Sequence, residues 1–186
     1  MLRTAEAMRA GVHPRTLYRL RDAGVIVPLS RGLYRLAELP APVQPDLLAV
    51  ALRVPRGVLC LISALAYHGL TTQIPHAVDI ALPRGMGAPR LDWPPVHVYW
   101  FSGRAYTEGV EHAMIDGTRL AVYGPEKTLA DCFKYRNKLG MDLCLEALRR
   151  YRDRRGWRMD KLREYAAACR VQHTLQPYVD ALWSDA

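Results

Sequence analysis

The chain has 186 residues, of which 50% are hydrophobic and 24% are charged, and its formal net charge is +8. This length allows one domain or two small ones, and the positive charge, carried mostly by Arg, favours a polyanionic or acidic partner. The charged N-terminus excludes a signal peptide, and the longest apolar run, residues 58–67, is too short to cross a membrane. We therefore expect a cytoplasmic protein with no membrane partner.

The cysteines give no sign of a metal site. Cys60, Cys132, Cys144 and Cys169 form no CxxC pair, and none has a His at zinc-ligand spacing. We expect four reduced, buried thiols, and neither a metal nor a cofactor.

Residues 4–36 predict two short helices joined by a tight turn and followed by a two-stranded ribbon. The first helix should have Thr4 as its N-cap and end at Gly11, and the second should start at Pro14 and end at Gly24. Strands are predicted around 25–27 and 33–36. This order is typical of a winged helix-turn-helix, which places its second helix in a DNA major groove. The helix that usually precedes this pair is expected either to lie upstream of Met1 or to be absent.

The second helix is predicted to have an apolar and a basic face. Leu17 and Leu20 are three residues apart and should point inward. On the opposite face and in the ribbon turn, Arg side chains suit guanine and phosphate, while hydroxyl groups suit phosphate. The alternative is a solvated basic face on a purely structural or protein-binding winged helix, but seven Arg against three acidic residues in positions 1–38 favour DNA. The predicted DNA-binding residues are Arg15, Thr16, Tyr18, Arg19, Arg21 and Arg31.

A proline-rich segment follows this unit. Three prolines within residues 38–45 predict a stiff linker at 39–45, between a domain at 1–38 and a larger one at 46–186. In the larger domain we expect helices at 46–53 and 58–68, strands within 76–123, and helices within 125–183. Asp116-Gly117 predicts a type I′ hairpin. The expected fold class is α+β, with an N-terminal winged helix and a C-terminal domain that ends in a helical bundle.

Three blocks of sequence resemble the AbiEi family of antitoxins from bacterial type IV toxin–antitoxin systems. They are GVHPRTLYRLRDAGVIVPLSRGLYRL, SALAYHGLTTQIPHAVDIALPRG and YGPEKTLADCFKYRNKLGMDLCLEALRRYRDR. The resemblance implies that the winged helix binds inverted repeats in its own promoter and represses it. It also implies that the C-terminal domain neutralises a nucleotidyltransferase-like toxin, and it does not require a stable complex with that toxin. Inverted repeats would place two copies side by side on the DNA.

Two basic segments are candidates for antitoxin function. Residues 149–158, RRYRDRRGWR, carry six Arg. Three interpretations are open: a contact surface for the toxin or its nucleic-acid substrate, a second DNA contact, or a solvated helix end and loop. The block PEKTLADCFKYR belongs to the same domain by resemblance, and its Lys127 and Asp131 should form an i,i+4 salt bridge. The candidate residues are Lys127, Asp131, Lys134, Arg136, Arg149, Arg150, Arg154 and Arg155.

No catalytic site is expected. Glu126 and Lys127 are adjacent and open a helix, which does not fit a metal nuclease, and the chain has neither a P-loop nor a nucleophile elbow. The leading hypothesis is a DNA-binding antitoxin and autorepressor without enzymatic activity. The alternative is a stand-alone winged-helix transcription factor whose C-terminal domain senses a ligand or dimerises. A nuclease-like enzyme ranks third.

Overall fold

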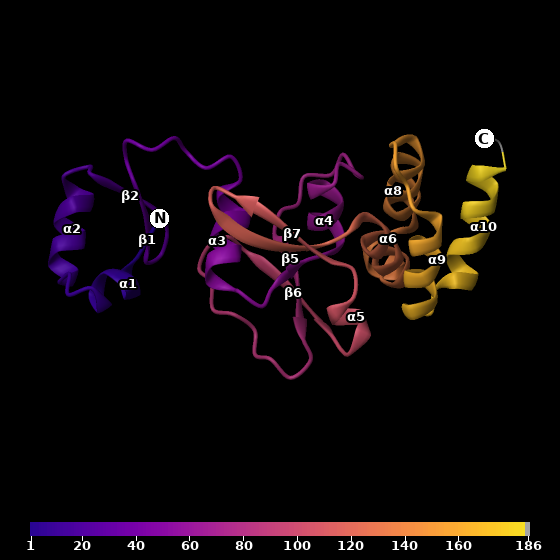
Figure 1. Ribbon diagram of the computed structural model, residues 1–186, viewed down its shortest axis with the longest axis horizontal. Helices are drawn as coiled ribbons and strands as arrows, with labels where there is room; N and C mark the ends of the chain where they lie inside the picture. Colours follow the sequence, from indigo (N-terminus) through magenta and orange to yellow (C-terminus); the bar gives the residue numbers. More distant parts are fainter. Residues whose placement is uncertain (185–186) are drawn as a thin grey trace.

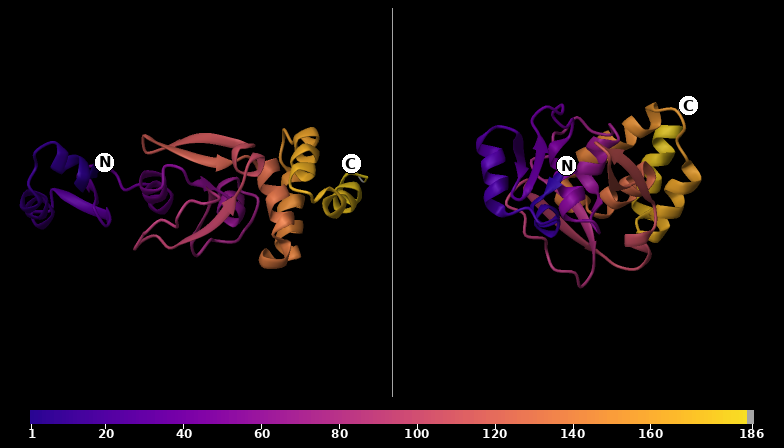
Figure 2. Two further views of the ribbon diagram at one scale, coloured as in Figure 1. Left: turned by 90° about the horizontal axis from the view of Figure 1, so that it is seen from below. Right: turned by 60° about the vertical axis from the view of Figure 1, so that its left-hand side comes forward.

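The computed structural model describes residues 1–184 and has the predicted α+β fold. An N-terminal unit, a central sheet and a C-terminal group of helices follow one another along the long axis of the molecule (Figure 1). The left-hand view in Figure 2 shows the same order, with the N-terminal unit and the C-terminal helices at opposite ends.

The N-terminal unit contains two helices and a small sheet. Its elements are β1 (Leu2–Arg3), α1 (Thr4–Arg9), α2 (Pro14–Asp22), β2 (Ile26–Ser30) and β3 (Leu33–Leu36), and its strands pair antiparallel in the order β1-β3-β2. Gly11 and Gly24 follow the two helices with φ of +85° and +72°, as predicted for C-terminal glycines. One detail was wrong: Thr4 is the first helical residue, and Arg3 occupies the N-cap. The arrangement is compatible with a winged helix-turn-helix.

A small apolar core holds this unit together, and a few contacts join it to the rest of the chain. Ala7, Leu17, Ile26 and Tyr34 are buried in this core. Residues 37–44 run through turns and bends to α3 (Pro45–Arg53), where Arg3 Nη2 donates to the carbonyl of Leu52 over 2.6 Å.

The central sheet has five strands in the order β6-β5-β4-β8-β7. These are β4 (Val58–Leu59), β5 (Val78–Pro83), β6 (Val96–Phe101), β7 (Val110–Ile115) and β8 (Thr118–Tyr123). The pairs β4–β8 and β5–β6 are parallel, and β4–β5 and β7–β8 are antiparallel. The predicted hairpin is confirmed, because Asp116 and Gly117 both have positive φ, 46° and 75°, as a type I′ turn requires.

Alternation along the strands divides the core into two layers, because successive side chains point to opposite sheet faces. Ile80, Leu82 and Val122 pack with residues of α3 in one layer. Ala81 and Tyr123 pack with the C-terminal helices in the other layer. The sheet is therefore covered on both faces.

The single helix predicted over 58–68 is wrong. The structure instead has β4 at 58–59 and α4 (Leu61–Tyr67), and Leu61 adopts φ of +45° where the chain changes direction. A short apolar run fits a buried strand and a buried helix equally well. Pairing with β5 and β8 on either side decides the outcome here.

The C-terminal part is helical, with α5 (Arg104–Thr107) preceding the β7–β8 hairpin. The helices are α6 (Pro125–Lys134), α7 (Arg136–Leu139), α8 (Met141–Asp153), α9 (Met159–Ala168) and α10 (Gln172–Trp183). The four cysteines are buried and form no disulfide, as predicted. Within residues 1–184, no helix combines the length and apolarity needed to span a bilayer.

Candidate nucleic-acid interface

The helix α2 is fixed at both ends by local interactions. Pro14 occupies the first helical turn, and the Nδ1 atom of His13 accepts a hydrogen bond from the Arg15 backbone N–H over 3.2 Å. This cap was not predicted from the sequence, although the position before Pro14 is where an N-cap belongs. Gly24 follows the helix with a positive φ and ends it. The burial of Leu17 sets the rotation of the helix about its own axis.

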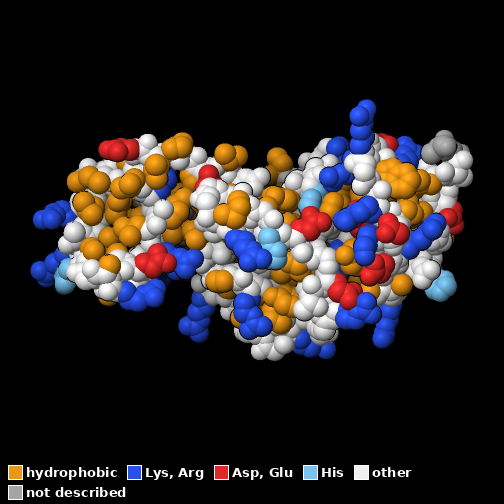
Figure 3. Space-filling model, viewed as in Figure 1, with side chains coloured by type: hydrophobic (Ala, Val, Ile, Leu, Met, Phe, Trp, Pro, Cys, Tyr) orange, Lys and Arg blue, Asp and Glu red, His pale blue; other side chains and the backbone are white. Residues whose placement is uncertain are grey.

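The outward face of α2 carries the predicted basic residues. Arg15, Tyr18 and Arg19 are exposed, Thr16 is half-buried, and Leu17 is buried, so the predicted orientation of this helix is confirmed. Positively charged side chains project from this end of the molecule in the space-filling view (Figure 3). Within residues 1–184, the guanidinium groups of Arg15 and Arg19 have no hydrogen-bond or ion-pair partner. These two cations are available to a ligand without breaking an internal contact.

Arg21 differs from these two arginines. Its Nη2 and Nε atoms donate to Asp22 Oδ1 over 2.7 and 2.9 Å, and its guanidinium lies 5.2 Å from the centre of the Tyr18 ring. The hydrogen bond to Asp22 raises the pKa of Arg21. Contact with DNA through Arg21 would therefore require it to release Asp22 or to share its guanidinium.

The ribbon turn places Arg31 beside the C-terminal part of the chain. Arg31 Nη1 lies 3.2 Å from Asp92 Oδ2, which belongs to the loop between β5 and β6. A cleft of about 540 Å³ separates α2 from this turn, and Tyr18, Arg21 and Arg31 line it. Arg53, at the end of α3, lines the same cleft. Neither Asp92 nor Arg53 was predicted from the sequence, because only the folded chain brings Asp92 next to Arg31 and Arg53 next to Gly32.

The basic segment 149–158 lies at the end of α8 and in the loop after it. Arg150 is bound to Glu146 over 3.0 Å, rather than standing free. Arg149, Arg154 and Arg155 are exposed, and in the described part of the chain their side chains have no hydrogen-bond partner. Among the described residues of this segment, these three arginines are the exposed ones whose side chains make no internal contact.

A hydrogen-bond network centred on the buried Glu126 anchors that loop to α6. Tyr151 Oη donates to Glu126 Oε1 over 2.7 Å, and Arg158 Nη2 donates to Glu126 Oε2 over 3.0 Å. Burial alone would raise the pKa of Glu126, but the hydrogen bonds from Arg158 and Tyr151 bring that pKa below its ordinary value. The carboxylate of Glu126 therefore stays charged and fixes the position of the arginine-rich loop.

The other candidate segment, residues 125–136, is largely buried. Lys127 and Asp131 form the predicted i,i+4 salt bridge, but each side chain is only 1% exposed. Lys134 is exposed, and Arg136 donates to the carbonyl of Phe133 over 3.0 Å. A partner molecule cannot touch Lys127 or Asp131 in the folded chain, so of the four candidate residues in this block only Lys134 and Arg136 lie where a partner could reach them.

The chain combines a helix with exposed arginines, a small antiparallel sheet beside it and a larger α+β part. Residues 1–37 match a family model described as "Transcriptional regulator, AbiEi antitoxin". The resemblance to that family is confirmed over this segment, which contains the whole candidate interface except Asp92 and Arg53. No curated protein matches the chain.

Proposed function

We propose that the chain is a DNA-binding transcriptional regulator that also acts as the antitoxin of a type IV toxin–antitoxin system. Its winged helix-turn-helix would be residues 1–38, its linker 39–45 and its antitoxin domain 46–186. The observation that carries this proposal is the pair of unengaged guanidinium groups, Arg15 and Arg19, on the outward face of α2. The match of residues 1–37 to a family of transcriptional regulators supports it.

In this proposal, α2 lies in the major groove. Arg15 and Arg19 are four residues apart and project on the same side, so either can reach guanine O6 and N7 with both arms of its guanidinium. Thr16 and Tyr18 bind phosphates and set the position of the helix along the groove. Arg31 reaches the sugar–phosphate backbone beside the groove after it leaves Asp92.

The regulator would act on its own promoter. Two copies on an inverted repeat would place two α2 helices in successive major grooves, one helical turn apart. Bound there, the pair covers the promoter and represses transcription. No enzymatic step is proposed for this chain.

For the antitoxin domain, we propose that Arg149, Arg154 and Arg155 form the contact surface, either for the toxin or for the nucleic acid on which the toxin acts. The Glu126–Tyr151–Arg158 network supports this surface, because it holds both ends of the loop between α8 and α9. Protection from the toxin would not require a long-lived complex.

The DNA-binding part is tested by fluorescence anisotropy with the chain's own promoter fragment and a scrambled fragment of equal length. Arg19→Ala should weaken promoter binding by about 1–3 kcal/mol, which corresponds to roughly 5- to 150-fold, and should change binding to scrambled DNA much less. Arg9→Ala, an exposed arginine on α1, is the matched control and should leave the promoter preference intact. Equal affinity for both fragments, in the wild type and in Arg19→Ala alike, would refute sequence readout by α2.

The antitoxin part is tested separately by co-expression. Induction of the adjacent nucleotidyltransferase-like gene should arrest growth, and the wild-type chain should restore it. The Arg19→Ala variant should also restore growth when it is expressed from an unrelated promoter. Growth arrest that persists with the wild-type chain would contradict the antitoxin assignment and leave the DNA-binding result standing.

A further inference from the structure

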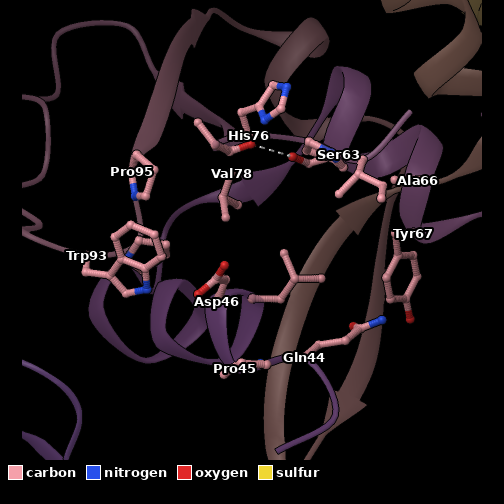
Figure 4. A pocket seen from close by; sticks show the side chains of 15 residues that line it. Gln44, Pro45, Asp46, Ser63, Ala66, Tyr67, His76, Val78, Trp93 and Pro95 are labelled. Carbon is pink, nitrogen blue, oxygen red and sulfur yellow. Dashed lines mark hydrogen bonds between the residues drawn. The ribbon is translucent and has the colours of Figure 1, made fainter. Parts of the chain in front are cut away.

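A pocket of about 370 Å³ opens where the connecting segment enters the C-terminal part of the chain. The start of α3, the helix α4 and the two segments 74–78 and 93–95 surround it. Figure 4 shows Trp93 on one side, Tyr67 on the opposite side and Asp46 at the start of α3 between them. Its volume falls within the range of small-molecule sites in proteins, which are concave and mostly apolar.

The walls of this pocket carry large apolar side chains that remain open to solvent. Ile74 is 84% exposed and Trp93 is 58% exposed. Leu47, Val78 and four prolines add to the apolar lining. A large indole and a branched aliphatic side chain on the rim of one concavity are typical of a surface that a ligand covers.

The charge of the pocket indicates the kind of ligand. The whole chain has 26 Lys and Arg against 18 Asp and Glu. Among the residues that the structure describes, no Lys or Arg lines the pocket, and Asp46 is the one formally charged lining residue. Its carboxylate points into the space beside Trp93 and Val78 (Figure 4). Within residues 1–184, the Asp46 side chain has neither a hydrogen-bond nor an ion-pair partner.

We propose that this pocket binds a small organic cation. The apolar part of the ligand, an aromatic ring or a short alkyl chain, packs on Trp93 and Ile74, and its ammonium group pairs with the carboxylate of Asp46. Two interactions then act on the ligand together: burial of its apolar part, and a charge-assisted hydrogen bond beside an indole face that also attracts cations. A carboxylate ligand with the same skeleton cannot form the charge-assisted hydrogen bond and is repelled by Asp46.

A pair of probes with one ring system and opposite charge tests this proposal on the full chain. Tryptamine and indole-3-propionate are titrated by calorimetry, and the indole N–H resonance of Trp93, assigned with Trp93→Phe, reports the place of binding. Tryptamine should bind at least about 10-fold more tightly than indole-3-propionate and shift the Trp93 resonance, because only the amine gains the charge-assisted contact.

Two variants separate the pocket from a general effect of helix ends. Asp46→Asn should reduce the preference for tryptamine to near parity. Asp142→Asn is the matched control, because Asp142 also lies in the first turn of a helix but does not line this pocket. Circular dichroism checks that each variant is folded. If a variant is unfolded, the ratio of the wild-type affinities for tryptamine and indole-3-propionate still decides the test.

Three results would overturn the proposal. The first is the absence of saturable binding by tryptamine, phenethylamine and hexylamine alike. The second is binding of the amine and the acid with equal affinity, or an amine preference that survives in Asp46→Asn. The third is a response of the Trp93 resonance to an arginine-containing peptide but to none of the amines, which would assign the pocket to a protein partner.

Discussion

The buried ion pair of α6 offers a test of whether Lys127 and Asp131 serve the fold or the antitoxin activity. Both side chains are 1% exposed. Lys127 Nζ also lies 4.4 Å from the centre of the Tyr123 ring, and Cys169 Sγ donates to Asp131 Oδ1 over 3.2 Å. Asp131→Ala leaves a buried ammonium without its anion, and Lys127→Met leaves a buried carboxylate without its cation.

The magnitudes follow from this burial. Removal of one member of a buried, hydrogen-bonded pair costs about 3–5 kcal/mol of unfolding free energy, because the remaining charge stays desolvated. Replacement of both members by apolar side chains of similar size removes that charge, so the double variant Lys127→Met/Asp131→Leu should lie within about 1 kcal/mol of the wild type or be more stable. The sum of the two single effects would therefore greatly exceed the effect of the double change.

Urea unfolding followed by far-UV circular dichroism measures the three variants, and co-expression with the toxin measures their activity. We expect the double variant to keep its protective activity, because no partner can reach either side chain. Single variants that cost less than about 1 kcal/mol, the value of an exposed pair, would refute the buried geometry. A double variant that is as stable as the wild type but gives no protection would refute the structural role.

The pH dependence of one variant sharpens the test. Burial raises the pKa of Asp131, and the neighbouring Lys127 acts against this shift. In Lys127→Met that opposition is gone, so the pKa of Asp131 in the folded state rises further. A group whose pKa is raised by folding contributes stability that is lost as the pH rises through the folded value. The deficit of Lys127→Met should therefore be smaller at pH 5 than at pH 8.

Three further results are expected. Asp92→Asn frees the arginine of the ribbon turn from an exposed ion pair and should tighten promoter binding by up to about 5-fold in anisotropy titrations, as such pairs are worth at most about 1 kcal/mol; weaker binding would contradict this. Burial lowers the pKa of His68, so the folded chain loses stability as the pH falls below the ordinary value of 6.5, and His68→Gln should make unfolding free energy less dependent on pH between 7 and 5; an unchanged dependence would count against it. Arg154→Glu with Arg155→Glu should abolish protection from the toxin and spare promoter binding, whereas the exposed control Arg163→Glu should spare both; if the double change leaves protection intact, that surface is only solvated.

Local signals in the sequence were sufficient for much of the fold. A first-turn proline and a C-terminal glycine define α2 within one turn, since both act on their own backbone. Asp116-Gly117 fixes the β7–β8 hairpin for the same reason. The segment 58–68 was assigned wrongly because Val58 and Leu59 become a strand only through partners about 20 and 60 residues away in sequence.

In the candidate interface, too, the features that depend on local sequence were predicted and those that depend on distant residues were not. Helical periodicity was enough to place Arg15 and Arg19 on the outward face of α2, because that face depends on one helix and one small core. The burial of Lys127 could not be read from its spacing to Asp131, since an i,i+4 pair usually lies on an exposed face. Asp92 is 61 positions from Arg31, and nothing in either local sequence indicates that they meet.

An exposed ion pair joins the pocket wall to the ribbon turn of the N-terminal unit, and its strength limits communication by this route. Asp92, which binds Arg31 over 3.2 Å, immediately precedes Trp93 of the pocket wall. A cation that draws Trp93 inward would pull Asp92 with it and free Arg31 for phosphate. Because the pair is exposed, it contributes at most about 1 kcal/mol, so this route would change promoter affinity by no more than about 5-fold. Linkage requires the promoter to change the affinity for the cation by the same factor. A larger coupling would have to run through Gln44 and Pro45, which line the pocket at the point where the connecting segment enters α3.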